Sequence, residues 1–156
     1  MKTAVLQYNI LDDLKQLTKF GLSVSVVFSS IAGYLLAADQ IDWKILVLLA
    51  VGGYCMVGAS NAFNQIIERG PDALMKRTMN RPIPAGRISV NVAMVIAVAL
   101  TLLGVIILYG INERTALFGS VSIFLYTSAY TPLKPITPLS VFVGAIPGAI
   151  PFMLGW

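Results

Sequence analysis

Long apolar segments, each close to the length that a helix needs to cross a bilayer, constrain this chain more than any other feature. Four of them fill about residues 20–38, 44–66, 90–110 and 114–131, and a fifth begins near residue 137 and continues to the last residue. A spanning helix takes about 20 apolar residues to cross roughly 30 Å of hydrocarbon, where the backbone must satisfy its own hydrogen bonds. The sequence therefore predicts an all-α, multi-pass transmembrane helical bundle with about five spans.

Composition agrees with this fold class and excludes some kinds of chemistry. Hydrophobic residues make up 57% of the 156 residues and charged residues only 12%, whereas a soluble domain averages about 25% charged residues. The chain contains no histidine, which excludes histidine acid–base catalysis and histidine–metal sites from this stretch. Its one cysteine, Cys55, lies in an apolar run and is interpreted as a small apolar side chain.

Basic residues gather in alternate connecting segments. If the N-terminus is cytoplasmic, nine of the eleven Lys and Arg residues lie in inner segments, and only Lys44 and Arg114 lie in outer loops. Cytoplasmic loops of membrane proteins carry such an excess of positive charge. We therefore expect the N-terminus and the loop between the second and third spans to face the cytoplasm.

Residues 1–19 precede the first span and form an interfacial N-terminal segment in our interpretation. Apolar residues recur there at helical spacing among charged ones, at Leu6, Ile10, Leu11, Leu14 and Leu17. This pattern is typical of an amphipathic helix lying in the membrane interface. An ordinary cytoplasmic helix packed on the next segment explains the same pattern equally well.

Oxygen-bearing side chains appear at the end of the second span. Asn64, Glu68 and Asp72 are four residues apart, so on an uninterrupted helix they would share one face. Two carboxylates and an amide suit Mg²⁺, which keeps several waters and takes one or two protein carboxylates plus phosphate oxygens. Gly70–Pro71 predicts that the span ends near Arg69 and that a short helix follows. In that case Asp72 has an alternative role as a first-turn acid that favours the helix dipole.

A cluster of cations follows these oxygen ligands directly, and a smaller polar group lies before the fifth span. Arginine and lysine are the side chains that recognise phosphate, although topology and lipid headgroups also select basic loops. The tyrosine and lysine of the later group can both donate hydrogen bonds to phosphate oxygens. A tyrosine at a membrane interface is also commonly an aromatic-belt residue. These candidates are Lys76, Arg77 and Arg81 in the first cluster, and Tyr130 and Lys134 in the second. Arg87, at the end of the first cluster, is interpreted as a topology anchor.

The fifth span carries the repeat GAIPGAIP. Pro147 and Pro151 each remove a helix hydrogen bond, so we expect this span to be kinked or partly unwound. Close packing through Gly144 and Gly148 is the alternative interpretation. Because the apolar segment runs to Trp156 without a polar flank, we expect the chain to be the N-terminal part of a longer protein.

The motifs NQIIERGPD, LMKRTMNRPIPAGRIS and YTPLKPITPLSVFVGAIPGAIPFMLGW resemble the UbiA superfamily of intramembrane prenyltransferases, and within it the family of protoheme IX farnesyltransferases. The resemblance covers about residues 18–156. It departs from the family pattern at Glu68, where the family usually has Asp, and at Gly70, where it usually has another acid. The family also has about nine spans and a second acidic motif in its latter half, so the resemblance makes residues 1–156 the N-terminal part of a single membrane-embedded domain.

The resemblance implies transfer of a farnesyl group from farnesyl diphosphate to haem B, giving haem O. It implies that Asn64, Glu68 and Asp72 hold Mg²⁺ as the catalytic and metal-binding residues. It further implies that the diphosphate is bound by Lys76, Arg77, Arg81, Tyr130 and Lys134. The expected partners are then farnesyl diphosphate, haem B and the lipid bilayer, with no nucleic acid, and the expected location is the bacterial cytoplasmic (inner) membrane.

Three alternatives remain open on the sequence. One is a prenyltransferase of the same superfamily that acts on an aromatic or quinone precursor. Another belongs to a different class, an anion-binding secondary transporter whose broken fifth span holds the solute. The third is that these residues on their own are inactive, as part of a larger catalyst.

Overall fold

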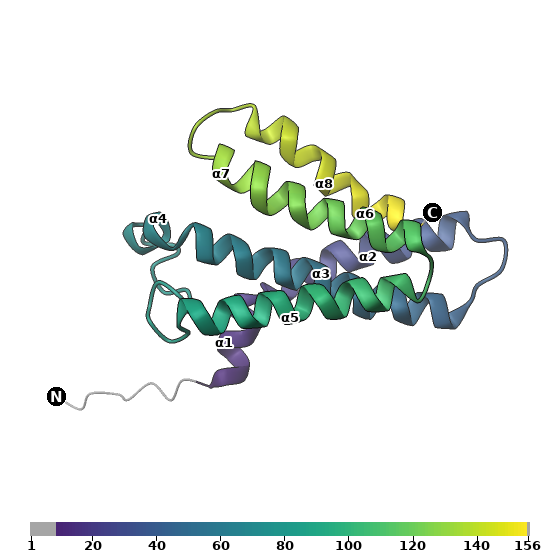
Figure 1. Ribbon diagram of the computed structural model, residues 1–156, viewed down its shortest axis with the longest axis horizontal. Helices are drawn as coiled ribbons and strands as arrows, with labels where there is room; N and C mark the ends of the chain where they lie inside the picture. The colour runs from purple at the N-terminus through teal and green to yellow at the C-terminus, as the bar shows by residue number, and fades with distance from the viewer. Residues whose placement is uncertain (1–8, 156) are drawn as a thin grey trace.

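The computed structural model describes residues 9–155, and within them the chain is helical with no strand. Its helices are α1 (Ile10–Leu17), α2 (Phe20–Ala37), α3 (Trp43–Ile67), α4 (Arg69–Leu74), α5 (Val90–Tyr109), α6 (Glu113–Phe124), the π-helix η1 (Leu125–Tyr130), α7 (Thr131–Leu133) and α8 (Ser140–Leu154). The long helices lie side by side as a bundle, with α3 packed most extensively on α5 and α8 packed on α2 and α6 (Figure 1).

Helix starts follow the local sequence closely. A short polar side chain stands at the N-cap of α1, α3, α5 and α6, and its oxygen accepts a backbone N–H of the first turn. These caps are Asn9, Asp42, Ser89 and Asn112. Because the caps lie at the ends of the apolar runs, the spans begin close to where the sequence predicted them.

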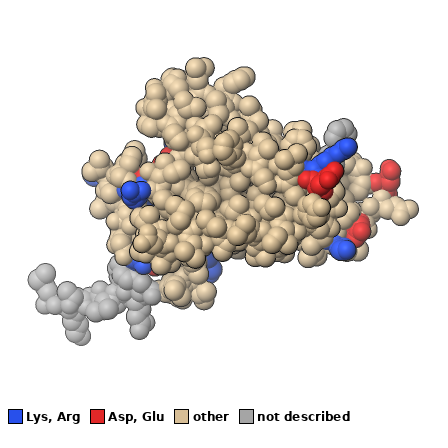
Figure 2. Space-filling view, viewed as in Figure 1, with Lys and Arg blue, Asp and Glu red and all other residues tan. Residues whose placement is uncertain are grey.

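Three helices, α2, α3 and α5, are long and apolar enough to cross a bilayer. The predicted fourth span is helical from residue 113 to 133 but is divided by the π-helix η1. The predicted fifth span appears as α8, whose 15 residues are fewer than the usual 20 or so. Charged atoms gather at the two ends of the face in Figure 2, and an uncharged band lies between them. The chain is therefore an integral membrane protein with an all-α fold.

The unwinding expected in the last span is not observed. Residues 140–154 of α8 stay α-helical through Pro147 and Pro151, and the Pro147 carbonyl accepts a hydrogen bond from the Ser122 hydroxyl at 3.3 Å. The irregularity lies instead in the preceding helix, at η1, where the backbone N–H of Thr131 reaches back five residues to the Tyr126 carbonyl. Such π-helical turns occur frequently at functional sites.

The two glycines proposed for close packing have different surroundings. A Cβ on Gly144 would lie 2.7 Å from a ring carbon of Tyr130, so only glycine lets α8 approach that ring. A Cβ on Gly148 would meet nothing within 4 Å. Close packing therefore explains Gly144 and not Gly148.

The segment ahead of the first span is tied to the rest of the protein. Leu6 lies outside the described residues, while Leu17 is fully buried and Ile10 and Leu11 are exposed. Asp13 of α1 accepts a hydrogen bond from the Arg87 guanidinium at 2.7 Å, so Arg87 connects α1 to the loop before α5. These contacts hold α1 against its neighbours, while the interfacial location of residues 1–19 stays a prediction.

Candidate functional site

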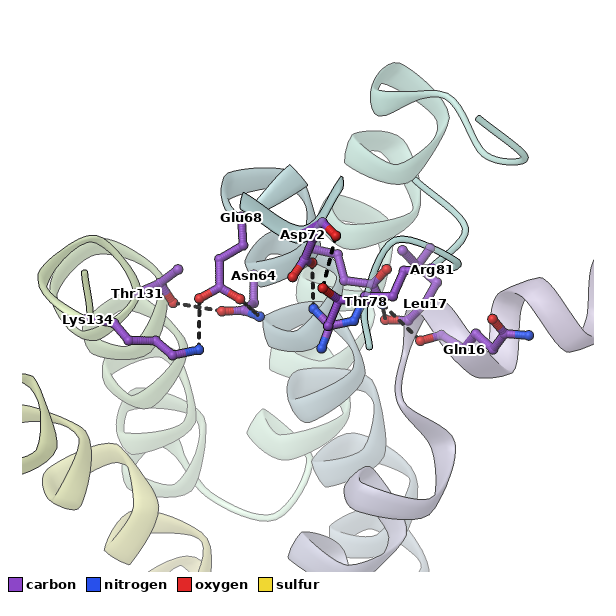
Figure 3. A network of polar contacts seen from close by, with 10 residues as sticks. Gln16, Leu17, Asn64, Glu68, Asp72, Thr78, Arg81, Thr131 and Lys134 are labelled. Atoms are coloured by element: carbon purple, nitrogen blue, oxygen red, sulfur yellow. Dashed lines mark hydrogen bonds and ion pairs between the residues drawn. The ribbon is translucent and has the colours of Figure 1, made fainter. Parts of the chain in front are cut away.

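Polar side chains meet where α3 ends and α7 begins (Figure 3). Asn64, in the last turn of α3, donates from Nδ2 to Glu68 Oε2 at 3.0 Å. Its Oδ1 accepts a hydrogen bond from Thr131 Oγ1 at 3.2 Å, and Glu68 Oε1 accepts one from Lys134 Nζ at 3.0 Å. Two of the predicted oxygen ligands and one predicted cation therefore belong to a single hydrogen-bonded network.

Asp72 lies in the adjoining short helix, α4. The side chain is buried, and its Oδ2 pairs with the Arg81 guanidinium at 2.5 Å. The Asp72 carbonyl also accepts a hydrogen bond from the Thr78 hydroxyl at 3.0 Å, which closes the loop between Asp72 and Arg81. Asp72 is therefore held by contacts within its own loop rather than by α7.

A break and a short helix are present, but the break lies at Glu68 rather than at Gly70–Pro71. Helix α3 ends at Ile67 and α4 begins at Arg69, so Gly70 and Pro71 lie inside α4. The four-residue backbone steps nevertheless continue across it. Glu68 N donates to the Asn64 carbonyl at 2.9 Å and Asp72 N donates to the Glu68 carbonyl at 2.8 Å. The three oxygen-bearing residues are thus on successive turns, although the helix that carries them is not continuous.

The donor set fits a magnesium ion that is completed by a substrate. No group of three or more His, Cys, Asp or Glu side chains that could hold a metal occurs in residues 9–155. Two carboxylates and an amide do match Mg²⁺, which takes few protein ligands and fills its other positions with water and phosphate oxygens. Each carboxylate is paired with a cation, so a metal would share or replace Lys134 at Glu68 and Arg81 at Asp72.

The remaining predicted cations and the tyrosine lie differently. Lys76 and Arg77 are exposed in the loop after α4 and make no hydrogen bond or ion pair with any residue that the structure describes. The ring of Tyr130 packs on Tyr126, with centroids 5.0 Å apart, and against Gly144. Its hydroxyl is without a hydrogen-bond partner among the described residues.

Two residues at or near this site were not predicted from the sequence. Thr131 was not predicted because it stands in the chain as an ordinary polar residue beside a proline, and its hydrogen bond to Asn64 joins residues 67 positions apart. Lys19 was counted as a topology charge, yet its pKa is lowered by burial and then by Arg81. Lys134 also lowers this pKa, whereas Glu68 and Asp72 raise it. The position of Lys19 directly before the first span was the sequence feature that could have indicated a role at the site.

An apolar cavity of about 160 Å³ lies below this cluster, between α2, α3, the α6–η1 helix and α8. Its walls include Leu22, Met56 and Pro147, while Asn61 and Tyr126 contribute polar groups. Asn61 precedes Asn64 by three residues and Tyr126 precedes Tyr130 by four, so each lies about one helical turn from the cluster. The polar site therefore lies at one end of the apolar cavity.

Fold and site together define a class of protein: a multi-pass helical membrane protein with a cation-rich polar site beside an intramembrane apolar cavity. The chain belongs to the UbiA prenyltransferase family, whose model matches residues 26–156. This membership agrees with the resemblance read from the motifs.

Named relatives are close in sequence. The chain is 68% identical over 148 residues to protoheme IX farnesyltransferase of Christiangramia forsetii, covering 95% of this chain and 49% of the relative. It is 64% identical over 151 residues to that of Flavobacterium psychrophilum, with coverages of 95% and 50%. The human mitochondrial protoheme IX farnesyltransferase is 41% identical over 150 residues, with coverages of 96% and 34%. The chain spans about half the length of the bacterial relatives it matches.

Two solved structures share the fold. One, from work on digeranylgeranylglyceryl phosphate synthase in membranes, has a TM-score of 0.86 at 20% identity and covers 93% of this chain and 52% of its own. The other is a UbiA homolog from Archaeoglobus fulgidus bound to DMAPP and Mg²⁺, with a TM-score of 0.82 at 18% identity and coverages of 92% and 53%. These similarities confirm the predicted all-α membrane bundle.

Proposed function

We propose that the full-length protein transfers a farnesyl group from farnesyl diphosphate to a vinyl group of haem B. Pyrophosphate leaves, and water adds to the carbocation formed at the vinyl group and loses a proton, giving haem O. The observation that carries the proposal is the Asn64–Glu68–Lys134 network beside the Asp72–Arg81 pair, at one end of an apolar cavity. Family membership and the names of the relatives support the same reaction. The Archaeoglobus homolog bound to DMAPP and Mg²⁺ supports a prenyl diphosphate and this metal as ligands.

In this proposal Asn64, Glu68 and Asp72 hold Mg²⁺ against the diphosphate. When bound, the metal would neutralise phosphate charge and stabilise the charge that develops on the leaving group. The protein has both carboxylates ready but paired with cations. An arriving diphosphate offers Lys134 and Arg81 new oxygens, which leaves Glu68 and Asp72 available as metal ligands.

Cations and the phenol act on the diphosphate itself. Arg81 and Lys134 are already positioned at the cluster, and Tyr130 lies on the helix that ends beside it. Lys76 and Arg77 are unpaired among the described residues and are free to approach an anion from the loop. Together these groups stabilise the negative charge that grows on diphosphate as the carbon–oxygen bond of the allylic substrate breaks.

The cavity receives the farnesyl chain in this proposal. Its apolar walls keep water away from the allylic cation, which would otherwise be quenched before the haem vinyl group attacks it. Residues 1–156 supply the first acidic motif of a single prenyltransferase domain, and the haem pocket and second acidic motif belong to the remaining part of the full-length protein. In this proposal the N-terminus and the site lie on the cytoplasmic side of the bacterial inner membrane, and the excess of Lys and Arg in the inner segments supports that orientation.

A reconstituted reaction tests this function. Full-length protein in liposomes is supplied with farnesyl diphosphate, Mg²⁺ and haem B, and haem O is detected by mass spectrometry together with released pyrophosphate. We expect both products, and neither when EDTA removes the metal. Prenylation of an aromatic acid with no reaction of haem B would instead assign the protein to a different acceptor, and solute uptake without pyrophosphate release would favour a transporter.

A further inference from the structure

Besides the exposed Lys76 and Arg77, a partly buried cation, Lys19, has no carboxylate partner among the described residues. Three basic residues in this part of the structure each pair with an acid. These pairs are Arg81–Asp72, Lys134–Glu68 and Arg87–Asp13. The Lys19 ammonium makes no hydrogen bond or ion pair with any residue in the range 9–155, although this side chain is only partly exposed. A partly buried charge without a partner is unfavourable. A ligand that supplies the missing negative charge would explain why a lysine stands at this position.

The backbone at Lys19 is held in an unusual conformation. Its φ of 48° lies in the left-handed region, which is unfavourable for a residue with a Cβ by roughly 1–2 kcal/mol. Lys19 is the one non-glycine residue among those described with a positive φ. Backbone strain of this kind persists only where surrounding contacts enforce it, and it is concentrated at binding and catalytic sites.

Two amides of α3 enforce this conformation. Gln65 Nε2 donates to the carbonyls of Gln16 and Leu17 at 2.9 and 3.0 Å, and Asn61 Nδ2 donates to the Thr18 carbonyl at 3.2 Å. Three successive carbonyls at the α1–α2 junction are therefore fixed to the helix that carries Asn64. The junction cannot relax without breaking buried hydrogen bonds, so Lys19 stays beside the polar cluster.

The charges around Lys19 come from every element that forms this cluster. Its pKa is lowered by burial, Arg81 and Lys134 and raised by Glu68 and Asp72, so the ammonium senses the α3–α4 junction, the following loop and the residue after α7. Both carboxylates are already paired with other cations. With three cations around two carboxylates, the cluster has an excess positive charge that an anion would neutralise.

We propose that the Lys19 ammonium binds the substrate diphosphate, as a third cation presented to the cluster from the α1–α2 junction. This inference rests on the proposed function, because it assumes that a diphosphate occupies the cluster. Gln65 and Asn61 are then positioning residues, which hold the strained backbone that presents the ammonium.

Binding of inorganic pyrophosphate in the presence of Mg²⁺ tests the proposal without depending on turnover. The full-length protein in liposomes is titrated with pyrophosphate as a competitor of farnesyl diphosphate. Lys19→Asn removes the charge, and asparagine tolerates the left-handed conformation. Lys19→Arg keeps the charge. Lys15→Asn is the matched control, since Lys15 lies on an exposed face of α1 with only a 3.9 Å contact to Asp12.

We expect Lys19→Asn to weaken pyrophosphate binding by about 10- to 100-fold, the effect of losing a charge-assisted hydrogen bond. Lys19→Arg should stay within about threefold of the unmodified protein and Lys15→Asn should not differ from it. Lys19→Gly, which relieves the backbone strain, is measured alongside in case the asparagine variant does not fold. Unchanged affinity in a folded variant that lacks the charge would overturn the role of Lys19 and leave the proposed function intact. If the unmodified protein itself does not bind pyrophosphate, the proposed function fails and this inference fails with it.

Discussion

Replacing Asp72 by asparagine in the full-length protein separates the metal-binding role of this carboxylate from its structural role. The substitution keeps the shape of the side chain and an oxygen that can accept from Arg81, but it removes the negative charge. The Arg81 side chain is 23% exposed, so water can partly compensate for its charge once the Asp72 charge is removed. Turnover and stability should therefore respond to different extents.

The expected loss of stability is small. A hydrogen bond to a charged group contributes about 1.5–3 kcal/mol and a neutral one about 0.5–1.5 kcal/mol. Since the Arg81 contact would survive as the weaker kind, the variant should lose about 1 kcal/mol of unfolding free energy. That change is too small to prevent folding or membrane insertion.

The expected loss of activity is larger. With one of two carboxylates gone, Mg²⁺ is held less tightly and less charge on the leaving group is neutralised. We expect kcat/KM for farnesyl diphosphate to fall at least about 100-fold, which corresponds to about 2.7 kcal/mol of transition-state stabilisation. Part of the loss should be recovered as the Mg²⁺ concentration is raised, because a weakened metal site fills at higher metal concentration.

Haem O formation in liposomes across a range of Mg²⁺ concentrations measures this effect, and thermal unfolding of the same preparations measures stability. Asp39→Asn is the matched control, because Asp39 is exposed in the loop between α2 and α3, away from the site. If Asp72→Asn retained turnover within about threefold of the unmodified protein, Asp72 would not be a metal ligand. A large loss that Mg²⁺ does not reduce would instead assign Asp72 the task of positioning Arg81.

Three further substitutions and titrations follow from the same contacts. Lys134→Gln removes the cation 3.0 Å from Glu68, so calorimetry should show about tenfold weaker pyrophosphate binding with no weaker binding of Mg²⁺ alone; a parallel fall in both would contradict this. Gly144→Ala places a methyl group 2.7 Å from a ring carbon and should be about 1–3 kcal/mol less stable than Gly148→Ala, which meets nothing within 4 Å; equal melting temperatures would show that the ring is free to move. Because burial lowers the pKa of Lys19 from 10.5, its contribution to pyrophosphate affinity should be complete below the lowered pKa and disappear as the pH rises through it. Lys19→Asn should remove that part of the pH profile.

Local sequence was sufficient for much of the fold. Apolar length located the helices, because in a bilayer the backbone has few alternatives to the helix. The structure adds that local caps such as Asp42 and Ser89 set where α3 and α5 begin. The existence of a break and a short helix after α3 was predictable for the same local reason, although the break lies at Glu68 rather than at Gly70–Pro71. The helical continuity of α8 through two prolines was not predicted, and neither was η1, since both depend on how the α6–η1 helix and α8 pack on each other.

Some residues of the candidate site were likewise predictable from local sequence, and others were not. Asn64, Glu68 and Asp72 could be selected from spacing and residue type alone, and the cations that follow could be recognised as groups for an anion. Their partners could not be selected in this way. Lys134 is 66 residues from Glu68 and Thr131 is 67 residues from Asn64, so no local pattern connects them.

By itself the sequence determined that this chain is a membrane-embedded helical bundle with a polar, basic region at one end, because the length of apolar runs and the position of charges are properties of single segments. Only the tertiary structure decided which cation meets which carboxylate, and that Lys19 has a left-handed backbone and no acidic partner within residues 9–155. Those facts arise from the packing of α1, α3 and α7 against one another. Contacts between segments far apart in the chain exist only once that packing has formed.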